Sequence, residues 1–376
     1  MPNKKPINVA FLYDDSLDGS EGVTQYVKTL GGWLEAQGHG VSYLVGETKA
    51  ESWQKGKVYS LAKNLKVVFN GNRLSIPYPA KKNDIRLALR QANPDILHVQ
   101  MPHSPFMSQK VLNRAKGTPA VGTFHIYPAN SLASLGSRLL KLLYLGGLSR
   151  IDEVVSVSSA AQSFAKRNFG LNSSVVPNMV DLSRYKQAKV VRQPQQIVFI
   201  GRLVKRKGCQ HLLKAFAEVN REIPSSRLII GGDGPERISL QQLVKKLGLS
   251  SVVEFKGYVP EDEKPDLLAS SAIACFPSLY GESFGIVLIE AMAAGTGVVL
   301  AGNNPGYLSV MGSVSEAMFE PKNTSELAAK LIHFLKNEQS AEQTHDKQSS
   351  LVKKFDVAQV GPQIEELYKR AIANHS

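Results

Sequence analysis

Two acidic residues stand out in the stretch GESFGIVLIEAMAAG, which covers residues 281–295. Nearly every position after Ser283 is apolar, so we expect a buried helix that Ser283 caps and that ends at Gly295. Glu282 lies just before the first turn, and Glu290 follows eight positions later, roughly two turns or about 12 Å along the axis. A carboxylate within an apolar helix is costly to bury unless something binds it. The pattern therefore favours a ligand that carries hydroxyl groups.

The start of this helix adds an anion site between the two acids. Its first backbone N–H groups, including those of Ser283, Phe284 and Gly285, have no partner within the helix, and the glycine permits a close approach. A nucleotide-diphosphate sugar fits this layout, with sugar hydroxyls near Glu282, the pyrophosphate at the helix start and the ribose near Glu290. The alternative is an ordinary core helix with two solvated acids.

A second stretch, GRLVKRKG, concentrates positive charge directly after a predicted strand over residues 196–200. Its cations are Arg202, Lys205, Arg206 and Lys207. The chain contains no Asp-x-Asp motif that would hold a divalent metal on a diphosphate, so we expect neither a metal nor a cofactor. Fixed cations would instead neutralise a leaving phosphate. A solvated basic loop is the alternative.

The elements that position these residues follow the pattern of a doubly wound sheet. Residues 7–13 read as a buried strand, 14–22 as a loop, 23–37 as a helix and 41–45 as a second strand. Such sheets bind ligands beyond the carboxyl ends of their strands. Gly22 in this loop would permit a close approach to phosphate, unless it is merely a glycine at the start of a helix.

The rest of the first half continues the same alternation. Residues 57–79 indicate a hairpin insertion and 132–148 a leucine-rich core helix. Further strands are predicted over 96–99, 120–124, 151–157 and 174–176. His125 directly follows one of these strands, where a side chain points toward the site; a buried structural histidine is the alternative.

The second half repeats this alternation. After the strand at 196–200 come a helix over 208–220, strands over 227–231, 252–255, 272–276 and 297–301, and a last helix over 357–372. We therefore predict an α/β protein with two facing Rossmann-like doubly wound domains and a site in the cleft between them. The predicted limits are 1–187 for the first domain, 188–195 for a linker, 196–355 for the second domain and 356–376 for a helix that returns to the first.

Composition limits the class of protein. The chain has 376 residues, which suits two domains, and a net charge of +13, which favours a polyanionic partner. Zinc-finger spacing and aromatic RNA-binding signatures are missing, so nucleic acid is not the expected partner. Both cysteines lie within predicted elements, and no apolar run reaches the eighteen or so residues of a spanning helix. We therefore expect a cytoplasmic protein.

The Glu, seven residues, Glu spacing resembles the signature of retaining glycosyltransferases of the GT-B type, particularly glycosyltransferase family 4. The match extends over nearly the whole chain. Ile76-Pro77-Tyr78, Asp95-Ile96-Leu97-His98, Gly122-Thr123-Phe124-His125 and the stretch 281–295 look most like phosphatidylinositol mannosyltransferases. The resemblance implies a nucleotide-sugar donor, with GDP-mannose as the best guess, and a membrane lipid such as phosphatidylinositol as the acceptor.

The same resemblance implies roles for single residues. Arg202 and Lys207 would stabilise the departing phosphate, and His125 would orient the reaction through a hydrogen bond without acting as a nucleophile. Tyr13 and Tyr78 match positions near the acceptor pocket.

A basic amphipathic helix over residues 81–92 would dock the protein on the inner face of the membrane. Its cations are Lys81, Lys82, Arg86 and Arg90, beside the apolar Ile85, Leu87 and Leu89; we assign Lys81 and Arg86 to the acceptor side. A solvated helix on an enzyme with a small acceptor is the alternative. A UDP-sugar donor with another acceptor, a nucleotide-sugar epimerase and a basic binding module remain open.

Overall fold

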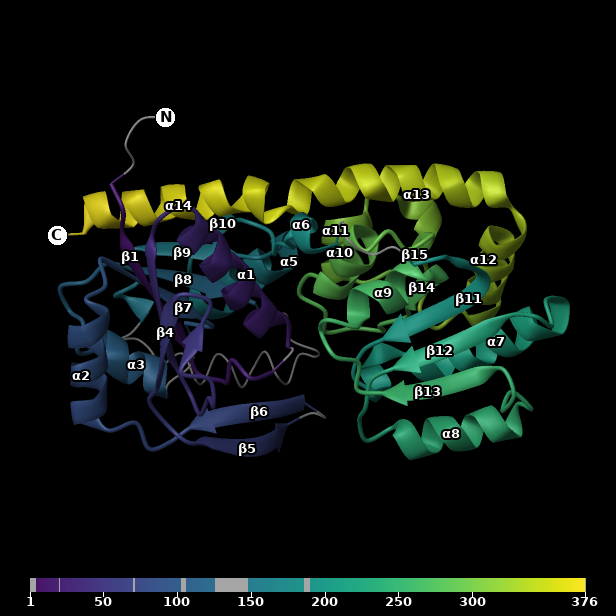
Figure 1. Ribbon diagram of the computed structural model, residues 1–376, viewed down its shortest axis with the longest axis horizontal. Coiled ribbons are helices and arrows are strands. Elements are labelled where there is room, and N and C mark those ends of the chain that lie inside the picture. Colours follow the sequence, from purple (N-terminus) through teal and green to yellow (C-terminus); the bar gives the residue numbers. More distant parts are fainter. Residues whose placement is uncertain are drawn as a thin grey trace. The chain divides into compact units, whose positions relative to one another are not determined.

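The computed structural model describes residues 5–19, 21–69, 72–102, 106–125, 148–185 and 190–375. The chain forms two compact units, Met1–Met179 with Val357–Ser376, and Val180–Asp356. Each unit holds a sheet of mainly parallel strands flanked by helices (Figure 1). The two predicted Rossmann-like domains are thus present, whereas the predicted helix over 132–148 lies, up to residue 147, outside the described residues.

The first unit is built on an eight-stranded sheet in the order β10-β9-β8-β7-β1-β2-β4-β3. Its strands are β1 (Asn8–Tyr13), β2 (Gly40–Val45), β3 (Ser52–Trp53), β4 (Gly56–Ser60), β7 (Ile96–Gln100), β8 (Ala120–Phe124), β9 (Glu153–Ser156) and β10 (Ser174–Val175). Its helices include α1 (Gly22–Ala36), α2 (Lys82–Ala92), α3 (Met107–Leu112), α5 (Ser159–Phe164) and α14 (Val357–Asn374). All neighbouring strands pair in parallel except β3 and β4.

The order of the strands locates the binding edge of this sheet. From β1 the chain first winds outward through β2 and β4, and then returns to place β7 on the other side of β1. The carboxyl ends of β1 and β7 therefore flank the point where the winding reverses, which is where doubly wound sheets bind ligands. The loops that begin at Asp14 and at Met101 lie at this point.

Alternation along β1 produces the two buried faces. Val9, Phe11 and Tyr13 pack into the cluster that contains α1 and α14, whereas Ala10 and Leu12 pack into the cluster with α2 and α3. A parallel strand covered on both faces needs apolar residues at successive positions, which explains the uninterrupted run in the sequence.

One predicted insertion is shorter than expected. The hairpin consists of β5 (Asn64–Phe69) and β6 (Asn72–Pro77), which pair in antiparallel fashion. The preceding residues 56–60 form β4 and pair in parallel with β2, so they belong to the main sheet. A short strand at the edge of a sheet and a short strand of a hairpin carry the same β-like pattern, which is why the sequence did not separate them.

The second unit contains a six-stranded parallel sheet in the order β13-β12-β11-β14-β15-β16. Its strands are β11 (Gln193–Ile200), β12 (Arg227–Gly231), β13 (Val253–Gly257), β14 (Ser271–Phe276), β15 (Val298–Gly302) and β16 (Met318–Phe319). Its helices include α6 (Leu182–Tyr185), α7 (Cys209–Glu222), α8 (Arg237–Lys246), α9 (Lys264–Ala269), α10 (Ile286–Ala293), α11 (Pro305–Met311), α12 (Thr324–Lys336) and α13 (Glu338–Val352). The winding reverses between β11 and β14, so the loops that follow these two strands flank the binding edge.

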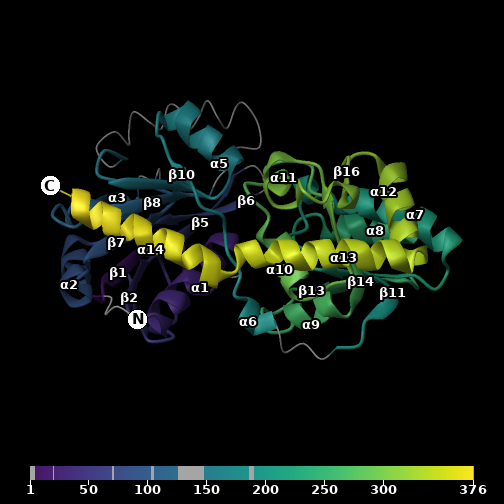
Figure 2. The same ribbon diagram turned by 90° about the horizontal axis from the view of Figure 1, so that it is seen from above.

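The C-terminal helix α14 completes the core of the first unit. It packs against α1 and against β8 and β9, and it lies across the sheet in Figure 2. Val360, Ile364 and Tyr368 are fully buried on its inner face. Gly361 lies against the ring of Trp33, where a Cβ would come within 2.6 Å of the ring atoms. The unit is therefore assembled from both ends of the chain.

Candidate active site

The cationic loop after β11 is held against the loop after β14 by a glycine. Lys205–Lys207 form one turn of 3-10 helix, and Gly208 then adopts a φ of +71°. A Cβ at Gly208 would collide with the carbonyl oxygen of Pro277, so only glycine permits this approach of the two backbones. The N–H of Leu279 donates to the carbonyl of Arg206 at 2.8 Å and fixes the same contact.

This contact brings Glu282 to the cations. Its Oε1 lies 2.8 Å from Nη1 of Arg206 and 2.8 Å from Nζ of Lys207, and the residue is only 9% exposed. Burial acts to raise the pKa of the Glu282 carboxyl, but the charges of Lys207 and Arg206 and hydrogen bonds from Lys207 and Ser278 outweigh it, so the pKa is lowered. Glu282 is therefore an ionised, buried acid at neutral pH.

Buried hydrogen bonds among Ser278, Asn304 and Tyr307 hold the loop that carries Glu282. Ser278 Oγ and Tyr307 Oη lie 3.0 Å apart, and the carbonyl of Ser278 accepts a hydrogen bond from Nδ2 of Asn304. The side chain of Asn304 also caps α11 by accepting from the N–H of Tyr307 at 3.0 Å. The loop after β14 is therefore tied to the start of α11, which limits how far Glu282 can move.

The helix between the two acids starts later than predicted. It begins at Ile286, and the residue that caps it is Gly285, with a φ of +114°. The expectation that Ser283 caps the helix is therefore wrong. A Cβ at Gly285 would come within 2.6 Å of the Tyr307 ring, so close packing and the left-handed backbone, both set by the fold, decide where the helix starts. Phe284 is buried against Phe355, at 5.5 Å between ring centroids. The predicted end is confirmed, since Gly295 has a φ of +77°.

Glu290 lies within α10 and has a buried partner that the sequence did not reveal. Its Oε1 accepts a hydrogen bond from Nζ of Lys264 at 3.0 Å, and the same nitrogen lies 2.8 Å from Oε2 of Glu261. Both Glu290 and Lys264 are 6% exposed. Burial acts to lower the pKa of Lys264, but the two carboxylates outweigh it and raise the pKa. The second acid of the pair is thus held in one orientation by a charged neighbour.

The loops after β11 and β12 also meet through their backbones. The N–H of Leu203, directly after Arg202, donates to the carbonyl of Asp233 at 2.9 Å. Gly232 and Gly234 pack so closely on Gly201 and Leu203 that a Cβ at either would collide with a carbonyl oxygen. Arg202 is therefore on a backbone fixed from both sides, at the same edge of the sheet as Lys207.

In the first unit, His125 follows β8 at the binding edge, as predicted. It is 8% exposed, and its Nε2 lies 2.8 Å from Oε1 of Gln100 at the end of β7. The ring packs edge-on against Tyr26 at 4.8 Å between centroids. The neighbouring His98 is fully buried between Tyr368 Oη and Thr123 Oγ1, each at 2.7 Å. Burial, and then the charge of His125, lower the pKa of His98 to about 3, so it stays neutral.

The other predicted residues of the first unit differ in exposure. Gly22 is exposed at the first position of α1. Tyr13 is only 5% exposed, with its Oη 3.3 Å from Thr24 Oγ1, so its ring belongs to the core. Tyr78 is 58% exposed, and Nζ of Lys110 lies 5.5 Å from its ring centroid. Of the two tyrosines, Tyr78 is the one whose ring is open to solvent.

Helix α2 has a narrower apolar face than predicted. Lys81, Lys82, Arg86 and Arg90 are exposed, as expected for its polar side. Ile85, however, is fully buried in the cluster with α3, and Leu89 packs against that cluster. Leu87, at 57% exposed, is the apolar side chain that α2 presents to solvent. Ile85 and Leu89 therefore pack on the core of the first unit, and whether the helix docks on a membrane stays a prediction.

Several residues that hold Glu282 and Glu290 in place had no role predicted from the sequence. Arg206 was seen as one of four cations without a role of its own, and Lys264 and Ser278 received none. Their contacts join segments that are 76, 26 and 29 residues apart, so no local pattern signals them. Gln100 could have been found, since it directly follows the strand predicted over 96–99, at the same edge as His125.

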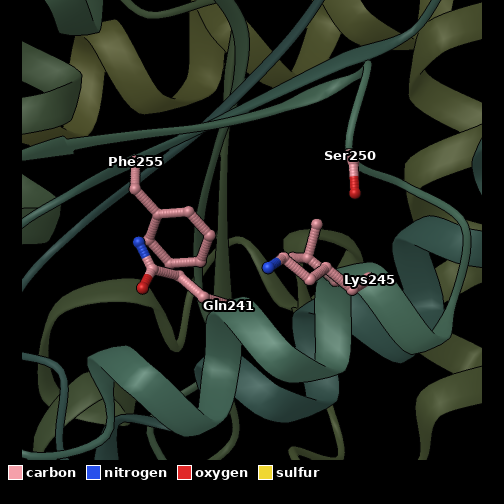
Figure 3. Close-up of a pocket in the computed structure, with 5 residues that line it drawn as sticks. Gln241, Lys245, Ser250 and Phe255 are labelled. Carbon is pink, nitrogen blue, oxygen red and sulfur yellow. The ribbon is translucent and has the colours of Figure 1, made fainter.

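A separate pocket of about 260 Å³ lies between α8 and β13. Its lining residues include Gln241, Lys245, Ser250 and Phe255, which surround it in Figure 3. None of them belongs to the site around Glu282.

Within the described parts of the chain, no three His, Cys, Asp or Glu side chains gather where they could hold a metal ion. No helix among the described residues is long and apolar enough to cross a membrane.

Comparison with known proteins gives the class. Residues 20–184 match the family model Glycosyltransferase Family 4, and residues 183–350 match the model Glycosyl transferases group 1. Phosphatidyl-myo-inositol mannosyltransferase of Mycolicibacterium smegmatis is 30% identical over 363 residues, which cover 94% of this chain and 91% of that protein.

Solved structures show the same fold. Sucrose-phosphate synthase from Thermosynechococcus elongatus matches with a TM-score of 0.76 at 19% identity, covering 97% of this chain and 99% of that one. HepE of Anabaena in complex with UDP matches with a TM-score of 0.73 at 17% identity, covering 96% and 100%. The fold is that of the GT-B glycosyltransferases, and this protein is a glycosyltransferase. The chain belongs to glycosyltransferase family 4.

Proposed function

We propose that this glycosyltransferase moves mannose from GDP-mannose to a phosphatidylinositol lipid and retains the configuration at the anomeric carbon. The observation that carries the proposal is the buried contact of Glu282 with Arg206 and Lys207 at the binding edge of the second unit. The identity of donor and acceptor is supported by the near full-length similarity to a phosphatidyl-myo-inositol mannosyltransferase.

The donor would be held by charge and by backbone. Lys207 contacts Glu282, which lies just before the N-terminus of α10, and Arg202 lies at the same edge of the sheet; their charges together would suit a pyrophosphate. Glu282 would accept hydrogen bonds from sugar hydroxyls, and Glu290 from the ribose. Because Glu282 already pairs with Lys207, a bound diphosphate would give that cation a second anionic partner and leave the carboxylate more available to the sugar.

The transfer itself needs a stabilised leaving group. The bond between the anomeric carbon and the phosphate oxygen breaks while the acceptor oxygen bonds to the same face of the sugar, and the departing phosphate takes the acceptor's proton. Arg202 and Lys207 would stabilise the charge that develops on this phosphate. His125 would orient a hydroxyl of the sugar or of the acceptor. No divalent metal would be required, since the sequence has no Asp-x-Asp motif.

The acceptor side is supported by the surface of the first unit. Four cations of the α2 region, together with Leu87 and Tyr78, are exposed on this unit. Such a surface suits reversible docking on an anionic membrane. We therefore place the protein at the inner, cytoplasmic face of the membrane.

The proposal is tested with the pure protein, a panel of GDP- and UDP-sugars, and vesicles with and without phosphatidylinositol. We expect a mannosylated lipid only with GDP-mannose and phosphatidylinositol, an α-linkage in its NMR spectrum, and no loss of rate with chelator. Transfer from a UDP-sugar instead would assign another donor. An inverted linkage or abolition by chelator would contradict the mechanism. Interconversion of donor sugars without transfer would point to an epimerase.

A further inference from the structure

One carboxylate oxygen of Glu282 is shared by two cations that are neighbours in the turn after β11. Oε1 lies 2.8 Å from Nη1 of Arg206 and 2.8 Å from Nζ of Lys207. The proposed donor binding requires Lys207 to contact a diphosphate as well. If Lys207 were the sole partner of this buried acid, its withdrawal would leave a buried charge uncompensated, which is costly. A second cation on the same oxygen removes this conflict.

Arg206 is bound to the loop that carries Glu282 at two points. Its carbonyl oxygen accepts a hydrogen bond from the N–H of Leu279 at 2.8 Å, and its Nη1 donates to Oε1 of Glu282 at 2.8 Å. Its Nε is buried as well. Lys207 reaches the same oxygen with the end of a flexible four-carbon chain, whereas the planar guanidinium is held at both its backbone and its tip. Arg206 is therefore the better anchored of the two cations.

The groups that face Glu282 from the surrounding elements show which charges matter. Burial acts to raise the pKa of Glu282, but the charges of Lys207 and Arg206 outweigh it, with a further hydrogen bond from Ser278. Tyr307 of α11 also faces the acid, and burial together with the charge of Glu282 raises the pKa of Tyr307 well above its usual value, so it stays neutral. Among the described residues, the charge of Glu282 is thus compensated by these two cations.

We infer that Arg206 is a positioning residue that stays with Glu282 when Lys207 turns to a bound diphosphate. The inference rests on the proposed binding of a nucleotide diphosphate at Lys207. Both cations share the acid in the free protein, and Arg206 alone compensates it in the bound state. Because a guanidinium does not lose its proton in proteins, Glu282 stays ionised and able to accept hydrogen bonds from sugar hydroxyls.

The first test needs no ligand. It follows the carboxyl carbon of Glu282 by ¹³C NMR of the full chain across pH, with the signal assigned by its loss in Glu282→Gln. Lys207→Met imitates the withdrawal of Lys207, and we expect Glu282 of this variant to stay ionised at neutral pH because Arg206 remains. A protonated Glu282 at neutral pH in a folded Lys207→Met would overturn the inference.

The second test is a double-mutant cycle for the binding of GDP, measured by calorimetry. In Arg206→Met the acid retains Lys207, so we expect GDP to bind about tenfold more weakly, the effect of one lost hydrogen bond between charged groups. In the Glu282→Gln background, the same substitution should change the affinity by less than about twofold, because no carboxylate then competes for Lys207. Arg206→Lys keeps a cation and should recover most of the affinity.

Two outcomes of the cycle would overturn the inference. Equal losses of affinity in both backgrounds would mean that Arg206 binds the diphosphate itself, and no loss in either would mean that Arg206 only packs. Failure of the wild type to bind GDP would contradict the proposed function, whereas the titration of Glu282 in Lys207→Met would still decide the inference about Arg206.

Lys205→Met is the matched control, since it removes one charge from the same turn at an exposed position. It should bind GDP within about twofold of the wild type, because an exposed charge in water contributes little. A loss as large as that of Arg206→Met would assign the effect to net charge and overturn the inference. Near-ultraviolet circular dichroism reports the fold of each variant, and Arg206→Lys provides a folded comparison if Arg206→Met is unstable.

Discussion

Glu282 is a buried acid whose neighbours, rather than its solvent exposure, keep it charged. Arg206 and Lys207 both contact the same oxygen, Oε1, and Ser278 adds a hydrogen bond. Removing one member would leave the remaining charges buried without their partner, which is costly. The stability of the second unit therefore depends on the ionised state of Glu282, which pairs with Arg206 and Lys207.

This link predicts a pH-dependent effect of Glu282→Gln. The folded-state pKa of Glu282 is lowered, so its contribution to stability is present above the unfolded-state pKa and is lost as pH falls through the folded-state value. We expect the variant to unfold about 2 kcal/mol more easily at pH 7. The difference in unfolding free energy should shrink as the pH drops below the usual pKa of a glutamate, because Glu282 of the wild type then becomes protonated too. Urea unfolding across pH measures it.

An exposed pair provides the comparison. Glu254 lies 3.5 Å from Lys256 on β13, and both side chains are largely exposed. Glu254→Gln should change stability by less than about 0.5 kcal/mol at every pH. Equal effects of the two substitutions would mean that Glu282 is not held by its cations.

Residue types at the site were predictable, whereas their pairing was not. Glu282 could be selected because it precedes an apolar helix that holds a second acid, Lys207 because it belongs to a group of cations in the loop after a strand, and His125 because it directly follows a strand. The contact between Arg206 and Glu282 crosses 76 residues and depends on how two loops approach, which no local pattern encodes. Tyr13 ends a strand that the sequence predicts to be buried, whereas the resemblance places it near the acceptor pocket; its 5% exposure agrees with the buried strand.

At the scale of elements, the turn Lys205–Lys207 depends on the glycine that follows it. Gly208 has a φ of +71° and no room for a Cβ beside the Pro277 carbonyl. The turn thus presents Lys207 to Glu282 only while the loops after β11 and β14 stay in contact. A glycine here serves both the backbone conformation and the close approach.

Substitution of two glycines with the same φ separates these two effects. Gly248 also has a φ of +71°, but a Cβ there would meet nothing within 4 Å. Gly248→Ala should cost about 1–2 kcal/mol, the price of the left-handed backbone alone. Gly208→Ala should cost about 1–3 kcal/mol more, because overpacking adds to it. Denaturant unfolding compares them, and equal losses would contradict the close approach.

The elements themselves were largely readable from the sequence. Apart from β4 and β16, the parallel strands of both sheets were predicted to within a few residues, because buried apolar runs and their turns are local signals. The start of α10 was misplaced because Ser283 is a good cap by type, whereas packing of Gly285 on Tyr307 decides the geometry. Strand β4 was assigned to an insertion because pairing partners cannot be read from one strand.

At the scale of the whole molecule, the net charge of +13 suits an anionic surface. The α2 region of the first unit exposes Lys81, Lys82, Arg86 and Arg90, each worth about 1 kcal/mol near such a surface. Changing all four to Gln should abolish flotation with vesicles that contain anionic lipid, and wild-type binding should fade with added salt.

The control removes the same charge elsewhere. Lys245, Lys246, Lys353 and Lys354 are exposed on the second unit, and their replacement by Gln lowers the net charge equally. This variant should still float. Equal loss in both variants would mean that total charge, and not the α2 region, drives binding. No flotation of the wild type at low salt would contradict membrane docking.

The cationic turn is tested most directly by single-turnover transfer of mannose from GDP-mannose to phosphatidylinositol vesicles, comparing Lys207→Met with Lys205→Met. The two lysines are two positions apart in the same turn, but Lys207 contacts Glu282 whereas Lys205 is exposed. We predict that Lys207→Met slows transfer by about 10² or more, because the departing phosphate loses a fixed cation. Lys205→Met should stay within about threefold of the wild type, since an exposed charge in water contributes little. Equal rates in the two variants, or no transfer by the wild type, would contradict the proposal that this turn holds the leaving group of a mannose donor.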